Sequence, residues 1–239
     1  MLSTDLAYLG IHLTSGRKPL TYATVDKDLN LLAISSGDMQ DILFYVASLP
    51  RIVIAINTPF ELRGKSTRGE FRTAELELRE RGIMVAGTPS TLALCPASMQ
   101  LGFKLIRKLS DQGFKYYPEA DNDLQMLETN SHACFCALAE DVPLSRTSLE
   151  GRLQRQLILY ERGLRIKDPM DFFEEITRHK MVKGIWPMEL LYSPNQLDAL
   201  VAAFTAWSVV QKTASTSFVG NKKDGQIFLP VSTLKEEYK

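Results

Sequence analysis

The sequence has few cysteines, no excess of either charge and no long hydrophobic run. Its 239 residues include three cysteines, and Lys plus Arg equals Asp plus Glu at 28 each. The number of cysteines is odd, and Cys134 and Cys136 are too close in sequence for an ordinary structural disulfide. No secretory signal precedes them. These absences argue against a disulfide-stabilised secreted domain, and we expect a cytoplasmic protein.

The balanced charge also excludes the global basic surface of a strongly basic nucleic-acid-binding protein. Local patches would have to carry any such role. No apolar run approaches the roughly 20 residues that a helix needs to cross a bilayer, so we expect no membrane partner. The length favours one large domain. We predict a single domain over residues 1–239 with helical insertions at about 121–190.

Hydrophobic patterns and turn residues predict the order of the elements. Three strand-like runs come first, at 6–13, 20–25 and 29–34. A helix with apolar spacing precedes Pro50, and residues 51–56 form a β-branched run typical of a strand covered on both faces. Further helices are predicted at 70–81 and 97–112, a short strand at 114–117, and a hairpin around the turn at 222–225. This order predicts a mixed α/β sheet flanked by helices, with a C-terminal β-hairpin.

The helix that begins after Ser193 carries one acid among small residues. Ser193 is a natural N-cap and Pro194 favours the first helical position. Asn195 and Asp198 then share a helical face. Alanines at 199, 202, 203 and 206 allow a close approach to a sheet, so we expect the polar pair to lie near that sheet.

Several segments, taken in order, resemble a family of unknown function described as predicted nucleases with an RNase H-like fold. They are the strand at 8–12, the strand and proline at 54–60, the arginine and acid series from Arg72 to Gly82, residues 116–119, the glycine-arginine helix at 148–155, the alanine-rich helix at 193–207 and the closing strand at 225–230. The resemblance covers most of the chain. It implies an RNase H-like mixed sheet.

The positions that are acidic in this family are mostly changed here. His12 and Asn57 stand where the family has aspartates, Lys115 stands where it has a glutamate three residues before a proline, and Asn195 replaces a second helical acid. Asp198 keeps its acid. RNase H-like nucleases hold one or two divalent cations between carboxylates, and magnesium prefers charged oxygen ligands. The resemblance therefore implies a degraded acidic metal site in a catalytically impaired protein that is associated with nucleic acid or acts as a scaffold.

Two alternatives stay open. An active metal-dependent nuclease would use Asp198 with relocated acids, Glu119, Asp121 or Glu61, and with His12 as a softer ligand for Mn²⁺ or Zn²⁺. Asp198 and Glu119 would then hold Mg²⁺ or Mn²⁺. A protein-interaction scaffold without nucleic-acid binding would use the helical insertions. The leading interpretation requires no cofactor.

Ordinary structural roles compete with each of these assignments. Asp198 can interact with the positive end of its helix, and His12 and Asn57 can be hydrogen-bonded residues of a strand. We expect no zinc at His132, Cys134 and Cys136, because a second ligand pair is missing. Four arginines are candidates to contact nucleic-acid phosphates, although a solvated surface is the competing interpretation: Arg68, Arg72, Arg152 and Arg155.

Overall fold

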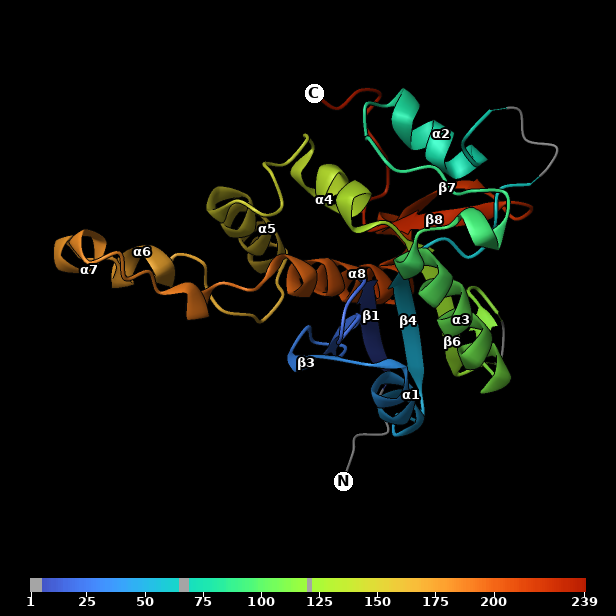
Figure 1. Ribbon diagram of the computed structural model, residues 1–239, viewed down its shortest axis with the longest axis horizontal. Helices are drawn as coiled ribbons and strands as arrows, with labels where there is room; N and C mark the ends of the chain where they lie inside the picture. The colour runs from blue at the N-terminus through green and yellow to red at the C-terminus, as the bar shows by residue number, and fades with distance from the viewer. Residues whose placement is uncertain (1–5, 65–68, 120–121) are drawn as a thin grey trace.

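The computed structural model describes residues 6–64, 69–119 and 122–239, which form one mixed sheet with helices on both faces (Figure 1). Its strands are β1 (Ala7–Leu13), β2 (Leu20–Val25), β3 (Leu31–Gly37), β4 (Ile52–Asn57), β5 (Lys115–Tyr116), β6 (Leu124–Thr129), β7 (Ser217–Asn221) and β8 (Gly225–Leu229). The order is β3-β2-β1-β4-β6-β8-β7, and β5 pairs with β6 at one side. The predicted mixed α/β fold is confirmed.

The direction of each strand follows from its connection. Short turns join β1, β2 and β3 and also β7 and β8, so these neighbours are antiparallel. Helical connections make β1, β4, β6 and β8 parallel neighbours. Residues 52–56 of β4 are all buried, as the unbroken apolar run predicted, because β4 lies between β1 and β6 with helices on both faces.

The helices form two layers. They are α1 (Met39–Ala47), α2 (Thr73–Glu80), α3 (Ala97–Asp111), α4 (Ser131–Ala139), α5 (Leu149–Glu161), α6 (Asp171–Glu175), α7 (Arg178–Val182) and α8 (Pro194–Gln211), with 3-10 turns at Leu92–Leu94, Met188–Leu190 and Thr213–Ser215. α8 covers one face of the sheet, α4 packs against both α8 and β8, and α5 packs against α8 and α4. α1 and α3 cover the opposite face, and α2 packs on the C-terminal hairpin.

Helix α8 is buried on nearly all sides, which fits its apolar sequence. Ser193 caps it by accepting a hydrogen bond from the Gln196 N–H at 3.3 Å, as predicted for a natural N-cap. A Cβ atom on Gly10 of β1 would collide with the backbone of Ala199 and Ala203. The glycine and the alanines together therefore let the helix axis approach the sheet.

The prediction of helical insertions at about 121–190 missed strand β6. Residues 124–128 pair with β4, whereas the predicted strand at 114–117 is reduced to the two-residue β5. The six residues of β6 mix apolar and polar side chains without a clear period, so β6 is defined by its pairing with β4. The helical segment begins at Ser131.

Helices α6 and α7 project from the body of the molecule as an arm, drawn in orange in Figure 1. The arm is residues 168–188. Phe172 is buried, and its ring stacks on that of Trp186 with the ring centroids 6.3 Å apart. This contact holds the beginning and the end of the arm against each other. Val182 is 79% exposed, and Phe173 and Ile185 are also exposed. Among the described residues, no helix is both long and apolar enough to cross a membrane.

Candidate functional site

The carboxyl ends of the parallel strands β1, β4 and β6 meet at one edge of the sheet, where ligands of open α/β sheets commonly bind. A pocket of about 470 Å³ lies there. We call it the strand-end pocket. The residues that give it its chemistry are His12, Asn57, His132, Arg146, Arg155 and Asp198. The structure thus brings together three of the predicted catalytic residues, His12, Asn57 and Asp198, and one of the predicted phosphate-contacting arginines, Arg155.

Hydrogen bonds fix the protonation pattern of His12. The N–H of Ser131 can only donate, and it donates to Oδ1 of Asn57 at 3.1 Å. Nδ2 of Asn57 therefore faces His12 and donates to its Nδ1 at 2.8 Å. A neutral imidazole whose Nδ1 accepts carries its proton on Nε2. Burial lowers the pKa of His12, and Arg146 adds to this effect, while Asp198 opposes it.

Asp198 is buried and already has a cationic partner. Nη2 of Arg146 donates to Oδ2 of Asp198 at 2.6 Å and to Oδ1 of Asn195 at 3.1 Å. The prediction that Asn195 and Asp198 share a face is confirmed, since one guanidinium nitrogen reaches both. Ser131 Oγ also donates to the backbone carbonyl of Asp198 at 3.0 Å, which joins α4 to α8.

The donor set of this pocket does not fit a magnesium centre. Asp198 supplies its carboxylate, but that group is bound to a guanidinium, and the neighbouring positions offer an amide and a neutral imidazole. Magnesium prefers charged oxygen ligands in octahedral geometry. Within the described residues, no group of three or more His, Cys, Asp or Glu side chains is arranged to hold a metal ion.

Lys115 and Glu119 lie elsewhere. Lys115 is exposed on β5 and pairs with Gln125 near the start of β6, at the opposite end of the sheet from the strand-end pocket. Glu119 is exposed and lines a second pocket together with Glu61. The relocated-acid alternative requires an acid beside Asp198, but neither Glu61 nor Glu119 lines the strand-end pocket. Asp121 lies outside the described residues.

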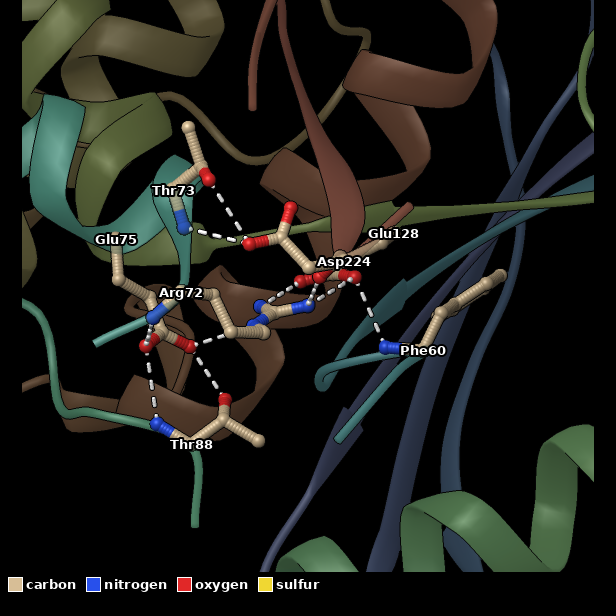
Figure 2. Close-up of polar contacts among 7 residues, drawn as sticks. All are labelled: Phe60, Arg72, Thr73, Glu75, Thr88, Glu128 and Asp224. Carbon is tan, nitrogen blue, oxygen red and sulfur yellow. Dashed lines mark hydrogen bonds and ion pairs between the residues drawn. The ribbon is translucent and has the colours of Figure 1, made fainter. Parts of the chain in front are cut away.

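The second pocket lies against a buried ionic network built around Arg72 (Figure 2). The Arg72 side chain is 1% exposed and donates to both oxygens of Glu128, with Nη2 at 2.5 Å and Nη1 at 3.1 Å. Its Nε donates to Glu75 at 2.8 Å. Burial alone would lower the pKa of Arg72, but Glu128 and Glu75 outweigh it and raise that pKa, so the guanidinium stays cationic.

Further hydrogen bonds hold the carboxylates of this network in place. Glu75 accepts from the N–H and the hydroxyl of Thr88. Glu128 accepts from the Phe60 N–H at 2.9 Å, and Asp224 accepts from the N–H and hydroxyl of Thr73, both at 2.9 Å. The groups labelled in Figure 2 come from the start of α2, the loop after α2, β6, the loop after β4 and the hairpin turn. The network therefore ties α2 and the hairpin to the sheet.

The other predicted phosphate-contacting arginines have partners inside the protein. Arg152 donates to the carbonyls of Tyr192 and Leu191 at 2.9 and 3.1 Å. Arg155 is 4% exposed and donates to the Leu144 carbonyl at 2.6 Å, although it also lines the strand-end pocket. Arg72 is enclosed in its network, and Arg68 lies outside the described residues. The exposed guanidinium in the pocket belongs instead to Arg146.

Sequence reasoning missed the acid of the strand beside β4. Glu128 pairs with Ile56, next to Asn57, and is 3% exposed. The resembled family has a proline three residues after its strand glutamate, but Ser131 stands three residues after Glu128. The proline pattern therefore pointed to Pro118 and to residues 115–119 instead. No local pattern identifies Glu128, because residues 124–129 carry no clear period and the strand is defined by its pairing with β4.

Cys136 and His132 are neighbours on α4, with Sγ 3.7 Å from Nε2. Burial raises the pKa of the Cys136 thiol to about 12. A thiol that stays protonated is a poor metal ligand, because the thiolate is the form that binds.

Comparison with known proteins gives one informative result. Residues 21–223 match a family described as a protein of unknown function, DUF429. The matched span includes Asn57, Arg72, Glu128 and Asp198 and begins after His12. No curated protein matches the chain.

Proposed function

We propose that this chain, which belongs to the DUF429 family, binds phosphate groups of a nucleic acid at the strand-end pocket and does not cleave them through a metal centre. The observation that carries the proposal is the pairing of Asp198 with Arg146 at 2.6 Å. The guanidinium of Arg146 is bound to the Asp198 carboxylate, which a metal cation would need as a ligand. The resemblance to predicted nucleases with an RNase H-like fold supplies the nucleic-acid part of the proposal.

The chemistry of metal-assisted hydrolysis supports the absence of cleavage. Two-metal phosphodiester hydrolysis needs several carboxylates around the cations that activate water and stabilise the leaving oxygen. Here β1 supplies His12 and β4 supplies Asn57, and the two are hydrogen-bonded to each other. Both side chains are neutral, so the pocket offers a cation little charge.

The geometry of Arg146 supports phosphate binding. Its side chain is 42% exposed, and a single nitrogen, Nη2, makes both contacts to α8. Within the described part of the chain, its Nη1 and Nε make no hydrogen bond. A guanidinium with a free edge can donate two parallel hydrogen bonds to a phosphate. Arg155 also lines the strand-end pocket and adds a second positive charge.

The test combines metal titration with charge variants. Labelled single- and double-stranded DNA and RNA are incubated with the protein at increasing Mg²⁺ and Mn²⁺, and binding is measured at several salt concentrations. We expect no cleavage, and binding that weakens with salt and survives chelation. Arg146→Gln should abolish binding, whereas Asp198→Asn should retain or strengthen it, because it removes a repelling carboxylate that also holds Arg146.

Controls separate this proposal from its alternatives. Arg178→Gln, at an exposed arginine on the arm, should leave binding unchanged. Metal-dependent cleavage that disappears in Asp198→Asn would establish an active nuclease and overturn the proposal. Failure to bind any of the nucleic acids at low salt would overturn it as well.

A second candidate function, a protein-interaction scaffold, is favoured by the arm. Its exposed apolar side chains include Val182 and Phe173, and exposed apolar patches commonly mark interaction sites. α6 carries Asp171 and Glu174, while Arg178 begins α7. Antiparallel pairing of two arms would match these charges, so a second copy of the chain is the partner that fits. Light scattering should show a dimer that Val182→Asp converts to a monomer; a wild-type monomer would exclude it.

A further inference from the structure

The second pocket, which we call the aromatic pocket, has a chemistry different from that of the strand-end pocket. It encloses about 290 Å³ between the loop after β4, the segment that follows β5, and strands β6 and β8. Aromatic rings form much of its wall: Phe60, Tyr116, Tyr117 and Phe228. We propose that this pocket binds a small organic cation, a protonated amine attached to an apolar or aromatic group.

The aromatic rings are held in defined positions. The ring centroids of Phe60 and Tyr116 are 5.3 Å apart, and Tyr117 meets Phe228 edge to face at 5.8 Å. Phe60 is also fixed through its backbone, because its N–H donates to buried Glu128. Ring faces attract cations electrostatically, and several rings around one cavity are a known arrangement for ammonium groups. The walls are therefore built before a ligand arrives.

The charge around this pocket favours a cation over an anion. Glu128 at the wall is paired with Arg72, but Arg72 also pairs with Glu75, so this network keeps an excess negative charge. Among the described residues that line the pocket, Glu61 and Glu119 are exposed acids without an ion pair. Of the described residues that line the pocket, Lys222 at the hairpin turn is the cationic one. The pKa of Tyr116 is raised by burial and by the carboxylates of Glu61 and Glu128, which agrees with a negative local field.

Gly225 keeps the aromatic pocket and the ionic network in contact. Its φ of +105° lies in the region that favours glycine, and a Cβ atom there would collide with the guanidinium of Arg72. The hairpin backbone can therefore lie directly against the Arg72–Glu128 pair, which positions Lys222 and Gln226 at the pocket wall. The proposal does not depend on nucleic-acid binding at the strand-end pocket.

The test compares a cation with a neutral molecule of nearly the same shape. Calorimetry with the full chain measures binding of 2-phenylethylamine and 2-phenylethanol. We expect the amine to bind more tightly than the alcohol. Tyr116→Ala, at a residue 47% exposed, should weaken amine binding by about 2- to 30-fold without unfolding the protein. Glu119→Gln should weaken it by about two- to fivefold.

The turn between β7 and β8 provides a matched pair of variants. Lys222→Gln removes a like charge from the pocket wall and should tighten amine binding, whereas Lys223→Gln, at a neighbour that does not line the pocket, should not. The proposal is overturned if the alcohol binds as tightly as the amine, or if neither binds at about 10 mM. It is also overturned if the two lysine variants behave alike.

Discussion

Two arginine–carboxylate pairs in this protein have similar distances but different surroundings. Arg72 and Glu128 are 2.5 Å apart with side chains 1% and 3% exposed, whereas Arg146 and Asp198 are 2.6 Å apart with side chains 42% and 8% exposed. The first pair is enclosed between α2, β6 and the hairpin. The second opens into the strand-end pocket. Similar ion-pair distances therefore accompany an enclosed guanidinium in one place and a guanidinium that is open to a pocket in the other.

The difference lies in how many donors each guanidinium has already used. Arg72 places Nε, Nη1 and Nη2 on protein acceptors, including the carbonyl of Asp224. Arg146 makes its contacts through Nη2 alone. A fully used guanidinium stabilises the fold and has nothing left for a ligand. A partly used one at a pocket can bind an anion.

The largest expected effect is the loss of stability when Arg72 is removed. Arg72→Met retains much of the side-chain volume but leaves Glu128 and Glu75 as buried carboxylates without a cation. Breaking a buried ion pair from one side costs about 3–5 kcal/mol. Urea unfolding should show a loss of this size in the free energy of unfolding.

A second variant separates the missing cation from poor packing. Arg72→Met combined with Glu128→Gln should lose less stability than Arg72→Met alone, because the unpaired carboxylate is also removed. If the double variant loses the sum of the two single effects, the pair is not coupled. The comparison between the two arginines would then lose its basis.

Local sequence signals predicted much of the fold. The cap at Ser193, the β-branched run of β4 and the turn before Gly225 each depend on neighbouring residues, and each element lies where it was predicted. Strand β6 was missed because six residues with mixed polarity carry no clear period. Its identity depends on pairing with β4, some 70 residues earlier in the chain.

The candidate site could be predicted only in part for the same reason. His12 and Asn57 end parallel neighbours, so the strand ends alone place them together. Arg146 reaches Asp198 across 52 residues of sequence, and no local pattern indicates that contact. The sequence also does not show which arginine side chain is buried, since Arg72 and Arg146 are residues of the same type. The number of free donors on each arginine became clear only from its tertiary contacts.

The next expected effect is a pH dependence of stability from His12 in the strand-end pocket. Its folded-state pKa is lowered, chiefly by burial, while Asp198 and Arg146 act on it in opposite directions. The unfolded chain therefore takes up the proton first as the pH falls below the ordinary histidine value of about 6.5. Stability should be full above that value and decrease as the pH falls toward the folded-state pKa.

Urea unfolding between neutral and mildly acidic pH measures this slope. His12→Gln should reduce it, and His132 should supply part of the remainder because its pKa is lowered too, mainly by burial. A slope unaffected by His12→Gln would show that the buried imidazole does not titrate as the geometry requires.

The smallest expected effect on stability comes from Arg146. Arg146→Gln removes the partner of Asp198, but the guanidinium is partly exposed and its site opens to solvent, so water can replace it. Exposed ion pairs contribute about 0–1 kcal/mol, and we expect a loss in this range by urea unfolding. An Arg146→Gln loss as large as that of Arg72→Met would mean that both pairs are structural. A small loss of stability together with lost nucleic-acid binding would separate the roles of the two arginines, because the same substitution would then affect the ligand far more than the fold.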